Sequence, residues 1–205
     1  MAFFLLSVLL LSFCPFETLG SACDSIHFVS RQEWKANPSN LTDMKLPVHH
    51  VFIHHTLQEE CHTKEECIKT VKTMQIFHNV TRNFGDIGYN FIVGGDGNVY
   101  VGRDWGKNGR HTKGMNEHSV AFSLCGDYNK KLPNEKMIKA TKQLIQCGLE
   151  KKVIAQDYQL HGHRDQVCTE CPGDLFYTQV RSPIEVRKWD RYVAGPLETY
   201  TCPYP

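Results

Sequence analysis

The fold of this chain is decided by His163-Arg164-Asp165-Gln166-Val167-Cys168-Thr169-Glu170-Cys171-Pro172-Gly173, taken together with Ile53-His54-His55-Thr56 more than a hundred residues earlier. Two histidines and one cysteine from such separated segments can form a three-ligand zinc site, which leaves the fourth position of a tetrahedral ion open for water. An open position is typical of a catalytic zinc site rather than a purely structural one. These segments therefore predict a metal site that is capable of catalysis.

Spacing alone does not identify the ligands among the eleven histidines of the chain. His161 and His163 lie two residues apart and could share one face of a strand, so either of them fits the pattern. A histidine on a strand is also more often a packed or surface residue than a metal ligand. On spacing, the choice between these two histidines stays open.

The run Val51-Phe52-Ile53-His54-His55-Thr56 is rich in β-branched and aromatic residues, which predicts a strand. Successive side chains of a strand point to opposite faces, so His54 is expected on the face of Phe52 and His55 on the face of Ile53. The two adjacent histidines are therefore predicted to point apart.

Further segments predict helices alternating with strands. The capping box Thr63-Lys64-Glu65-Glu66 opens a predicted helix of about five turns. A hairpin of residues 89–93 and 98–101 is predicted around Gly94-Gly95-Asp96-Gly97. After it come a mostly buried strand at 119–124, a helix opened by Pro133-Asn134-Glu135, and a short helix from about 174 to 180. Strands mixed with helices in this way predict a three-layer α/β protein.

Length and composition favour one domain. The chain has 205 residues, of which 41% are hydrophobic and 22% charged, and we expect residues 23–189 to form a single well-buried domain. The apolar run at 3–11, followed by small residues, has the form of a secretory signal peptide, so 1–22 are expected to be removed by cleavage near 20–22. Residues 190–205 lack periodicity and are expected to form an extended tail. The protein is therefore predicted to be secreted and to have no membrane span.

Cysteine usage agrees with export but leaves two readings open. Nine cysteines, less Cys14 of the signal segment, leave eight in a compartment where disulfides persist. All eight could form four disulfides with no metal bound. If Cys171 binds a metal, seven remain, and at least one of them is unpaired. Cysteine arithmetic alone does not choose between these readings.

A resemblance to the peptidoglycan recognition proteins extends from about residue 26 to 189. The segments that match this family in order and spacing are Ile53-His54-His55-Thr56, Asp86-Ile87-Gly88-Tyr89-Asn90-Phe91, Gly94-Gly95-Asp96-Gly97-Asn98-Val99-Tyr100, Gly102-Arg103-Asp104-Trp105, and Gly162-His163-Arg164-Asp165 with Thr169-Glu170-Cys171-Pro172-Gly173. The resemblance implies the α/β fold of the bacteriophage-lysozyme type of zinc amidase, with a central mixed β-sheet flanked by helices in a single domain. It also implies a groove on one face for the peptide stem and sugar of the bacterial cell wall.

By this resemblance, the zinc ligands are His54, His163 and Cys171. Family members that only recognise the wall commonly have serine at the position of Cys171, so the thiol implies a working enzyme. The family's catalytic tyrosine matches Tyr89, and the small hydroxyl residue beside the metal matches Thr169. The implied reaction is hydrolysis of the amide that joins N-acetylmuramic acid to L-alanine.

These residue types suit amide hydrolysis. Zn²⁺ activates water near neutral pH and polarises the scissile carbonyl. A phenol has an ordinary pKa near 10 and is a poor base at pH 7 unless the metal lowers that pKa. We therefore expect Tyr89 to stabilise charge in the transition state and Thr169 to help position it.

The family resemblance also implies disulfides. Cys61–Cys67 brackets the start of the first helix, and Cys23–Cys147 ties the amino-terminal cysteine to the second long helix. Cys125, in an apolar strand, is interpreted as a buried free thiol. Cys168 and Cys202 then remain, and they either pair with each other, which fixes the tail beside the zinc loop, or leave Cys202 to crosslink two chains.

The signs of substrate preference conflict. Within the family, Asn83-Phe84 resembles the pattern of proteins that bind lysine-type stem peptides, whereas Arg103 resembles the arginine that accompanies diaminopimelate-type wall. An arginine can bind a carboxylate as a bidentate pair, or it can form an ordinary surface ion pair. Mixed or broad recognition is expected. The further residues expected to line the groove are His55, Trp105, Arg110 and His111.

The expected partners are peptidoglycan or its muropeptide fragments, bound by a monomeric protein in innate immunity or the handling of microbes. The formal net charge is +1, and no basic cluster indicates a nucleic-acid partner. A recognition protein that binds wall without cutting it is the alternative function, and a disulfide-stabilised protein without zinc is a third.

Overall fold

The computed structural model describes residues 20–180 and 189–193. Most of the expected signal segment 1–22, and residues 194–205 of the expected tail, lie outside the described residues. The helices and strands are β1 (Phe28–Val29), β2 (Val48–His55), α1 (Lys64–Ile76), β3 (Phe91–Val93), β4 (Val99–Val101), β5 (Ser119–Leu124), α2 (Glu135–Glu150), β6 (Ile154–Gly162) and α3 (Asp174–Val180), with short helical turns at Ala22–Ser25, Phe77–Thr81 and His163–Asp165.

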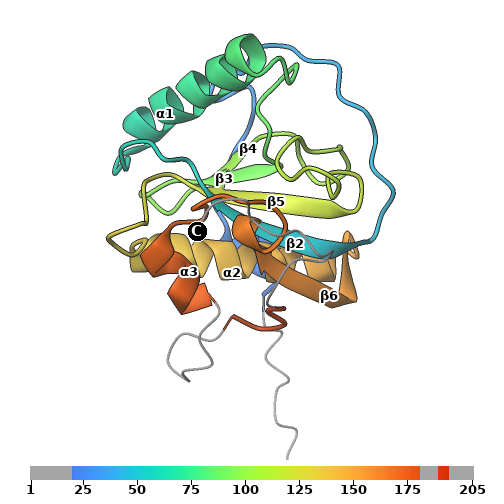
Figure 1. Ribbon diagram of the computed structural model, residues 1–205. Helices are drawn as coiled ribbons and strands as arrows, with labels where there is room; N and C mark the ends of the chain where they lie inside the picture. Colours follow the sequence, from blue (N-terminus) through green and yellow to red (C-terminus); the bar gives the residue numbers. More distant parts are fainter. Residues whose placement is uncertain (1–19, 181–188, 194–205) are drawn as a thin grey trace, which may run out of the picture.

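One mixed sheet forms the middle layer of the molecule (Figure 1). Its strand order is β1-β4-β3-β5-β2-β6. Only the β3–β4 hairpin is antiparallel, and the other neighbouring strands run parallel. Helix α1 lies above the sheet in Figure 1, whereas α2 and α3 lie below it. The predicted single-domain α/β fold with a central mixed sheet is therefore confirmed.

Strand β2 runs through the core between β5 and β6. Val51, Phe52 and Ile53 are fully buried, as expected of a parallel strand that is covered on both faces. The predicted alternation is confirmed, because the His54 ring lies near Phe52, at 6.4 Å between centroids, and the His55 ring lies near Tyr128, at 6.5 Å. At the carboxyl end of β2, the His54 and His55 side chains therefore point to opposite faces of the sheet.

The predicted helix starts are confirmed. At α1, the Thr63 hydroxyl accepts a bond from the Glu66 N–H, and the Glu66 carboxylate accepts one from the Thr63 N–H, which completes a capping box. At α2, the Asn134 side chain caps the helix by accepting from the Met137 N–H. The continuation of α1 into a π-helical turn at Phe77–Thr81 brings its last residues over the carboxyl end of β2.

Between cysteines that the structure describes, the disulfides Cys23–Cys147 and Cys61–Cys67 form, as the resemblance implies. Cys125 is a buried free thiol, which confirms that expectation. Cys168 is also disulfide-bonded, and Cys202, its expected partner, lies outside the described residues. In the part of the chain that the structure describes, no helix combines the length and the apolar character that crossing a bilayer requires.

Removing the Cys23–Cys147 bond is expected to destabilise the protein more than removing Cys61–Cys67. The two bonds span sequence separations of 124 and 6 residues. In the chain-entropy description, the longer loop contributes about 5 kcal/mol and the shorter about 2 kcal/mol to the free energy of unfolding. Guanidinium denaturation of the two double-alanine variants, each compared with the wild type, measures the difference. Equal losses would contradict an origin in loop entropy.

Candidate metal centre

The pairing of β2 with β6 brings two of the predicted ligands together. These parallel neighbours are in register at Ile53 and Gly162, so the next residues, His54 and His163, lie side by side at the carboxyl ends of the strands. Their ring centroids are 4.4 Å apart. The carboxyl ends of parallel strands are a common position for binding sites in α/β proteins.

His161 lies away from this pair. Its Nε2 is 3.1 Å from Nδ1 of His50, and its ring packs on Phe52 at 5.0 Å between centroids. The structure therefore groups His163, and not His161, with His54.

Cys171 reaches the two histidines because its loop folds back over the end of β2. Its Sγ lies 3.5 Å from Nδ1 of His54 and accepts a hydrogen bond from the His55 N–H at 3.4 Å. The backbone N–H of Arg164 donates to the Cys171 carbonyl at 3.0 Å. The Thr169 hydroxyl accepts from the Cys171 N–H at 3.2 Å. Hydrogen bonds to the Sγ, the N–H and the carbonyl of Cys171 thus hold its thiol beside the imidazoles.

The geometry of these side chains fits a tetrahedral zinc ion. The ligand atoms of His54, His163 and Cys171 all lie within 4.8 Å of one another. Zn–N and Zn–S bonds of about 2.0–2.3 Å at tetrahedral angles place the ligand atoms about 3.3–3.8 Å apart, so shifts on the order of 1 Å complete the site. A ligand set of two imidazoles and one thiolate is typical of catalytic zinc sites with one open position.

Burial determines the protonation states of the three candidate ligands, His54, His163 and Cys171. Desolvation lowers the pKa of His54 well below its ordinary value and the pKa of His163 to about 4, so both imidazoles are neutral and keep a lone pair for a metal. Burial raises the pKa of the Cys171 thiol to about 12. This thiol is therefore protonated at neutral pH, and binding a metal ion would require it to release that proton.

A threonine outside the ligand set orients His54. Nε2 of His54, the ring nitrogen that does not face Cys171, lies 3.4 Å from the Thr112 hydroxyl, which is itself 3.0 Å from Nδ1 of His111. Partners of this kind fix the ring orientation of a metal ligand. Thr112 was not predicted from the sequence, because it lies in an irregular loop with no motif.

Thr112→Val is expected to weaken Zn²⁺ binding on the order of tenfold, because the variant keeps the shape of the side chain but removes the hydroxyl beside His54. Chelator competition measures the dissociation constant. Thr141→Val is the matched control, since Thr141 is a buried threonine that bonds its own helix at Met137. An unchanged dissociation constant for Thr112→Val would remove Thr112 from the site.

A groove of about 500 Å³ opens beside the three ligands. Side chains from the carboxyl end of α1 form one wall and those around the metal ligands form the other. The residues that line it are His55, Thr56, Leu57, Gln58, Met74, Phe77, His78, Arg82, Phe84, Tyr89, Arg110, His111, His163, Thr169 and Cys171. Seven of these residues were not predicted from the sequence as part of the site: Thr56, Leu57, Gln58, Met74, Phe77, His78 and Arg82. Met74, Phe77 and His78 stand at helical i, i+3, i+4 spacing, which indicates a shared face but not a groove.

Tyr89 and Thr169, the residues predicted to be catalytic, both line this groove. The Tyr89 ring lies 5.2 Å from the His54 ring and 5.3 Å from the His78 ring, between centroids. Burial raises the pKa of Tyr89 above its ordinary value. The phenol therefore stays protonated at neutral pH and can donate a hydrogen bond.

The other residues predicted to bind substrate divide into two groups. His55, Phe84, Arg110 and His111 line the groove. Trp105 packs into the core against Phe91 and Phe122, and Asn83 is exposed next to Phe84 with a left-handed backbone.

Arg103 is 4% exposed, and its guanidinium donates to backbone carbonyls. Nε donates to Ile87, Nη1 to Asn108 and Nη2 to Phe84, at 2.6, 2.8 and 2.9 Å. These bonds hold together the loops on either side of Tyr89. The guanidinium therefore serves the fold at this position.

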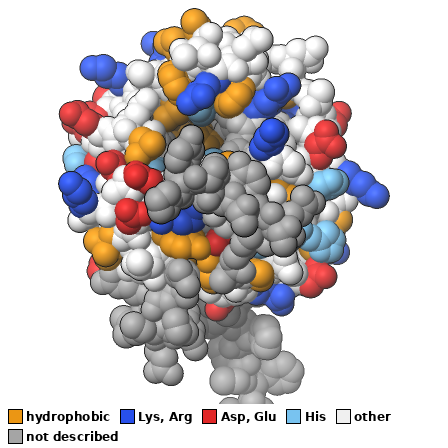
Figure 2. Space-filling view, viewed as in Figure 1, with side chains coloured by type: hydrophobic (Ala, Val, Ile, Leu, Met, Phe, Trp, Pro, Cys, Tyr) orange, Lys and Arg blue, Asp and Glu red, His pale blue; other side chains and the backbone are white. Residues whose placement is uncertain are grey.

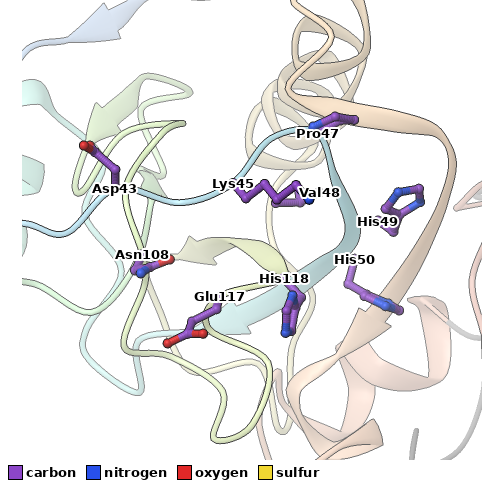
Figure 3. Close-up of a pocket in the computed structure, with 9 residues that line it drawn as sticks. All are labelled: Asp43, Lys45, Pro47, Val48, His49, His50, Asn108, Glu117 and His118. Atoms are coloured by element: carbon purple, nitrogen blue, oxygen red, sulfur yellow. The ribbon is translucent and has the colours of Figure 1, made fainter.

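A second hollow, of about 660 Å³, lies at the opposite end of β2 (Figure 3). Its lining residues come from the segment that enters β2 and from the loop before β5, and they are Asp43, Lys45, Pro47, Val48, His49, His50, Asn108, Glu117 and His118. Although three of these are histidines, His54, His163 and Cys171 are the one group of described residues whose donor atoms come close enough to hold a metal. On the face seen in Figure 2, acidic and basic side chains are interspersed, in agreement with the small net charge.

The chain is similar to several known proteins. The chain matches the family model described as N-acetylmuramoyl-L-alanine amidase over residues 44–174. It is 33% identical to the peptidoglycan recognition protein of Trichoplusia ni over 189 residues, which are 92% of this chain and 99% of that protein. It is 34% identical to peptidoglycan recognition protein 1 of Rattus norvegicus over 187 residues, 90% of this chain and 99% of that protein. The solved structure of peptidoglycan recognition protein LE in complex with tracheal cytotoxin, a monomeric diaminopimelic acid-type peptidoglycan, covers 81% of this chain and 95% of its own, with 33% identity and a TM-score of 0.77.

Proposed function

Because this chain belongs to the peptidoglycan recognition protein family, we propose that it is a secreted zinc amidase of innate immunity that binds bacterial peptidoglycan and hydrolyses the N-acetylmuramoyl-L-alanine amide. The observation that carries the proposal is the position of the Cys171 thiol beside two neutral imidazoles, with all three ligand atoms within 4.8 Å of one another. By resemblance, members that only bind wall commonly have serine at this position. The disulfides of the chain support an extracellular location.

The residues around the metal have separate tasks. His54, His163 and Cys171 would hold Zn²⁺, which would supply the Lewis acidity to activate water and polarise the scissile carbonyl. Tyr89, which keeps its proton, donates a hydrogen bond to the oxygen on which negative charge develops. Thr169 uses a lone pair to accept from the Cys171 N–H, so its own hydroxyl proton can be donated into the groove.

The groove walls suit a stem peptide attached to a sugar. Phe77 and Phe84 offer apolar surface, whereas Arg82 and Arg110 offer exposed positive charge for peptide carboxylates. His55 lines the groove, and its Nε2 is buried with no hydrogen-bond partner among the described residues. Since Arg103 is engaged by backbone carbonyls, carboxylates of either stem type meet the same two exposed arginines, and this supports hydrolysis of both wall types.

The test combines zinc analysis with digestion of purified peptidoglycan. Stoichiometric Zn²⁺ in the purified protein is expected, together with release of free stem peptides from lysine-type and diaminopimelate-type wall, detected by mass spectrometry. A chelator is expected to stop the release, and added Zn²⁺ to restore it. Protein that binds wall but releases no stem peptide would overturn the amidase and leave the alternative function, recognition without cutting.

A further inference from the structure

Residues 189–193 pair with the outer edge of the sheet (red in Figure 1). Tyr192 forms a parallel bridge with Leu160 of β6. The Leu160 N–H donates to the Arg191 carbonyl at 2.9 Å, and the Val193 N–H donates to the Leu160 carbonyl at 3.0 Å. Trp189 is 6% exposed and packs on Phe176 of α3. The first residues of the expected tail thus form part of the folded domain.

Tyr192 reaches from this edge to a buried carboxylate. Its hydroxyl lies 3.0 Å from Oδ1 of Asp165 and 3.0 Å from the hydroxyl of Tyr177. The Tyr177 hydroxyl in turn donates to the same Oδ1 at 2.5 Å. Asp165 is 2% exposed, so these phenols replace the water that would otherwise solvate its charge.

The second oxygen of Asp165 holds the turn that carries a zinc ligand. Oδ2 accepts from the Gly162 N–H at 2.7 Å, and Gly162 directly precedes His163. A Cβ at position 162 would lie 2.9 Å from the Tyr177 ring and 3.1 Å from Pro172, so the backbone is also confined by packing. The direction in which His163 leaves β6 is therefore set by the hydrogen bond from Gly162 to Asp165 and by the packing of Tyr177 and Pro172 against Gly162.

We infer that Tyr192 is a positioning residue for the metal site: through Asp165 it fixes the turn at Gly162 and orients His163 toward His54 and Cys171. The role lies outside the ligand set and outside the groove, in a segment that the sequence alone indicates only as a tail. A ligand that is held in its binding orientation before the metal arrives loses less conformational freedom on binding. Tyr192 therefore contributes to zinc affinity without touching the ion. The inference rests on the proposed metal site.

The test is Tyr192→Phe in the full chain, which keeps the ring and removes only the hydroxyl. Zn²⁺ affinity, measured by chelator competition, is expected to fall on the order of tenfold, the lower end of the range for outer partners of metal ligands. The absorption spectrum of the Co²⁺-substituted protein is expected to change, because it reports ligand geometry. Tyr177→Phe is expected to shift both readouts in the same direction.

Tyr158→Phe is the matched control, because Tyr158 lies on β6 and packs under Arg191, whereas the phenol bonds to Asp165 come from Tyr177 and Tyr192. It is expected to leave the affinity and the Co²⁺ spectrum unchanged. A Tyr192→Phe protein that melts earlier but keeps wild-type affinity and spectrum would show a merely structural role and overturn the inference. Wild-type protein that binds no Zn²⁺ would overturn the proposed function as well, so the two failures are distinguishable.

Discussion

Cys171→Ser is expected to lose zinc and amidase activity together. A serine hydroxyl is a far weaker zinc ligand than a thiolate, and the two remaining imidazoles, His54 and His163, do not provide the three protein ligands typical of a catalytic site. In the proposed mechanism the ion would supply several kcal/mol of transition-state stabilisation, so the rate of stem-peptide release should fall on the order of 10³-fold or more. Metal analysis of the purified variant and mass spectrometry of digested wall measure the two losses.

Cys125→Ala is the control for this experiment, since Cys125 is the other buried free thiol among the described residues. It lies in the core away from the three ligands and should keep both zinc and activity. Binding of insoluble peptidoglycan by the Cys171→Ser protein should persist, because the groove walls are unchanged. A Cys171→Ser protein that retains stoichiometric zinc would remove the thiol from the ligand set.

Tyr89→Phe is expected to separate chemistry from metal binding. The ring remains and can still pack beside His54, but the donor to the developing oxyanion is lost. Loss of one such donor lowers kcat on the order of 10²- to 10³-fold, while zinc content and wall binding stay at wild-type levels. The measurements are zinc analysis, a pull-down on insoluble wall and the rate of stem-peptide release.

Tyr158→Phe again provides a comparison, because it removes a phenol from a strand and not from the groove. Full activity in Tyr89→Phe would exclude a catalytic role for the hydroxyl. Loss of zinc from that variant would instead assign Tyr89 to the integrity of the metal site.

Local signals predicted the elements that carry the groove. Alternation in residues 51–56 and the capping box at Thr63 depend on near neighbours in the sequence, and both are confirmed. Strand β6 was missed, because exposed Gln156 and Asp157 interrupt its apolar pattern. Strand β1 has only two residues, Phe28 and Val29, and so leaves no periodic signal.

The parts of the site that the sequence missed depend on tertiary contacts. His161 and His163 could not be separated by spacing, since the register of β2 against β6 decides which of them meets His54. Arginine is a residue type that often binds ligands at a protein surface, yet the guanidinium of Arg103 donates to three backbone carbonyls. Thr112 and Tyr192 act through single hydroxyls on segments without a motif.

The register between β2 and β6 would also make the proposed metal ion a reporter of partial unfolding. His54 and His163 belong to different strands, and only the intact pairing at Ile53 and Gly162 keeps them 4.4 Å apart. An opening that separates these two strands dismantles the ion's coordination while α1 and α2 can remain helical, because regions of a protein open with different free energies. Zinc loss during gradual denaturation should therefore precede the loss of helical circular dichroism.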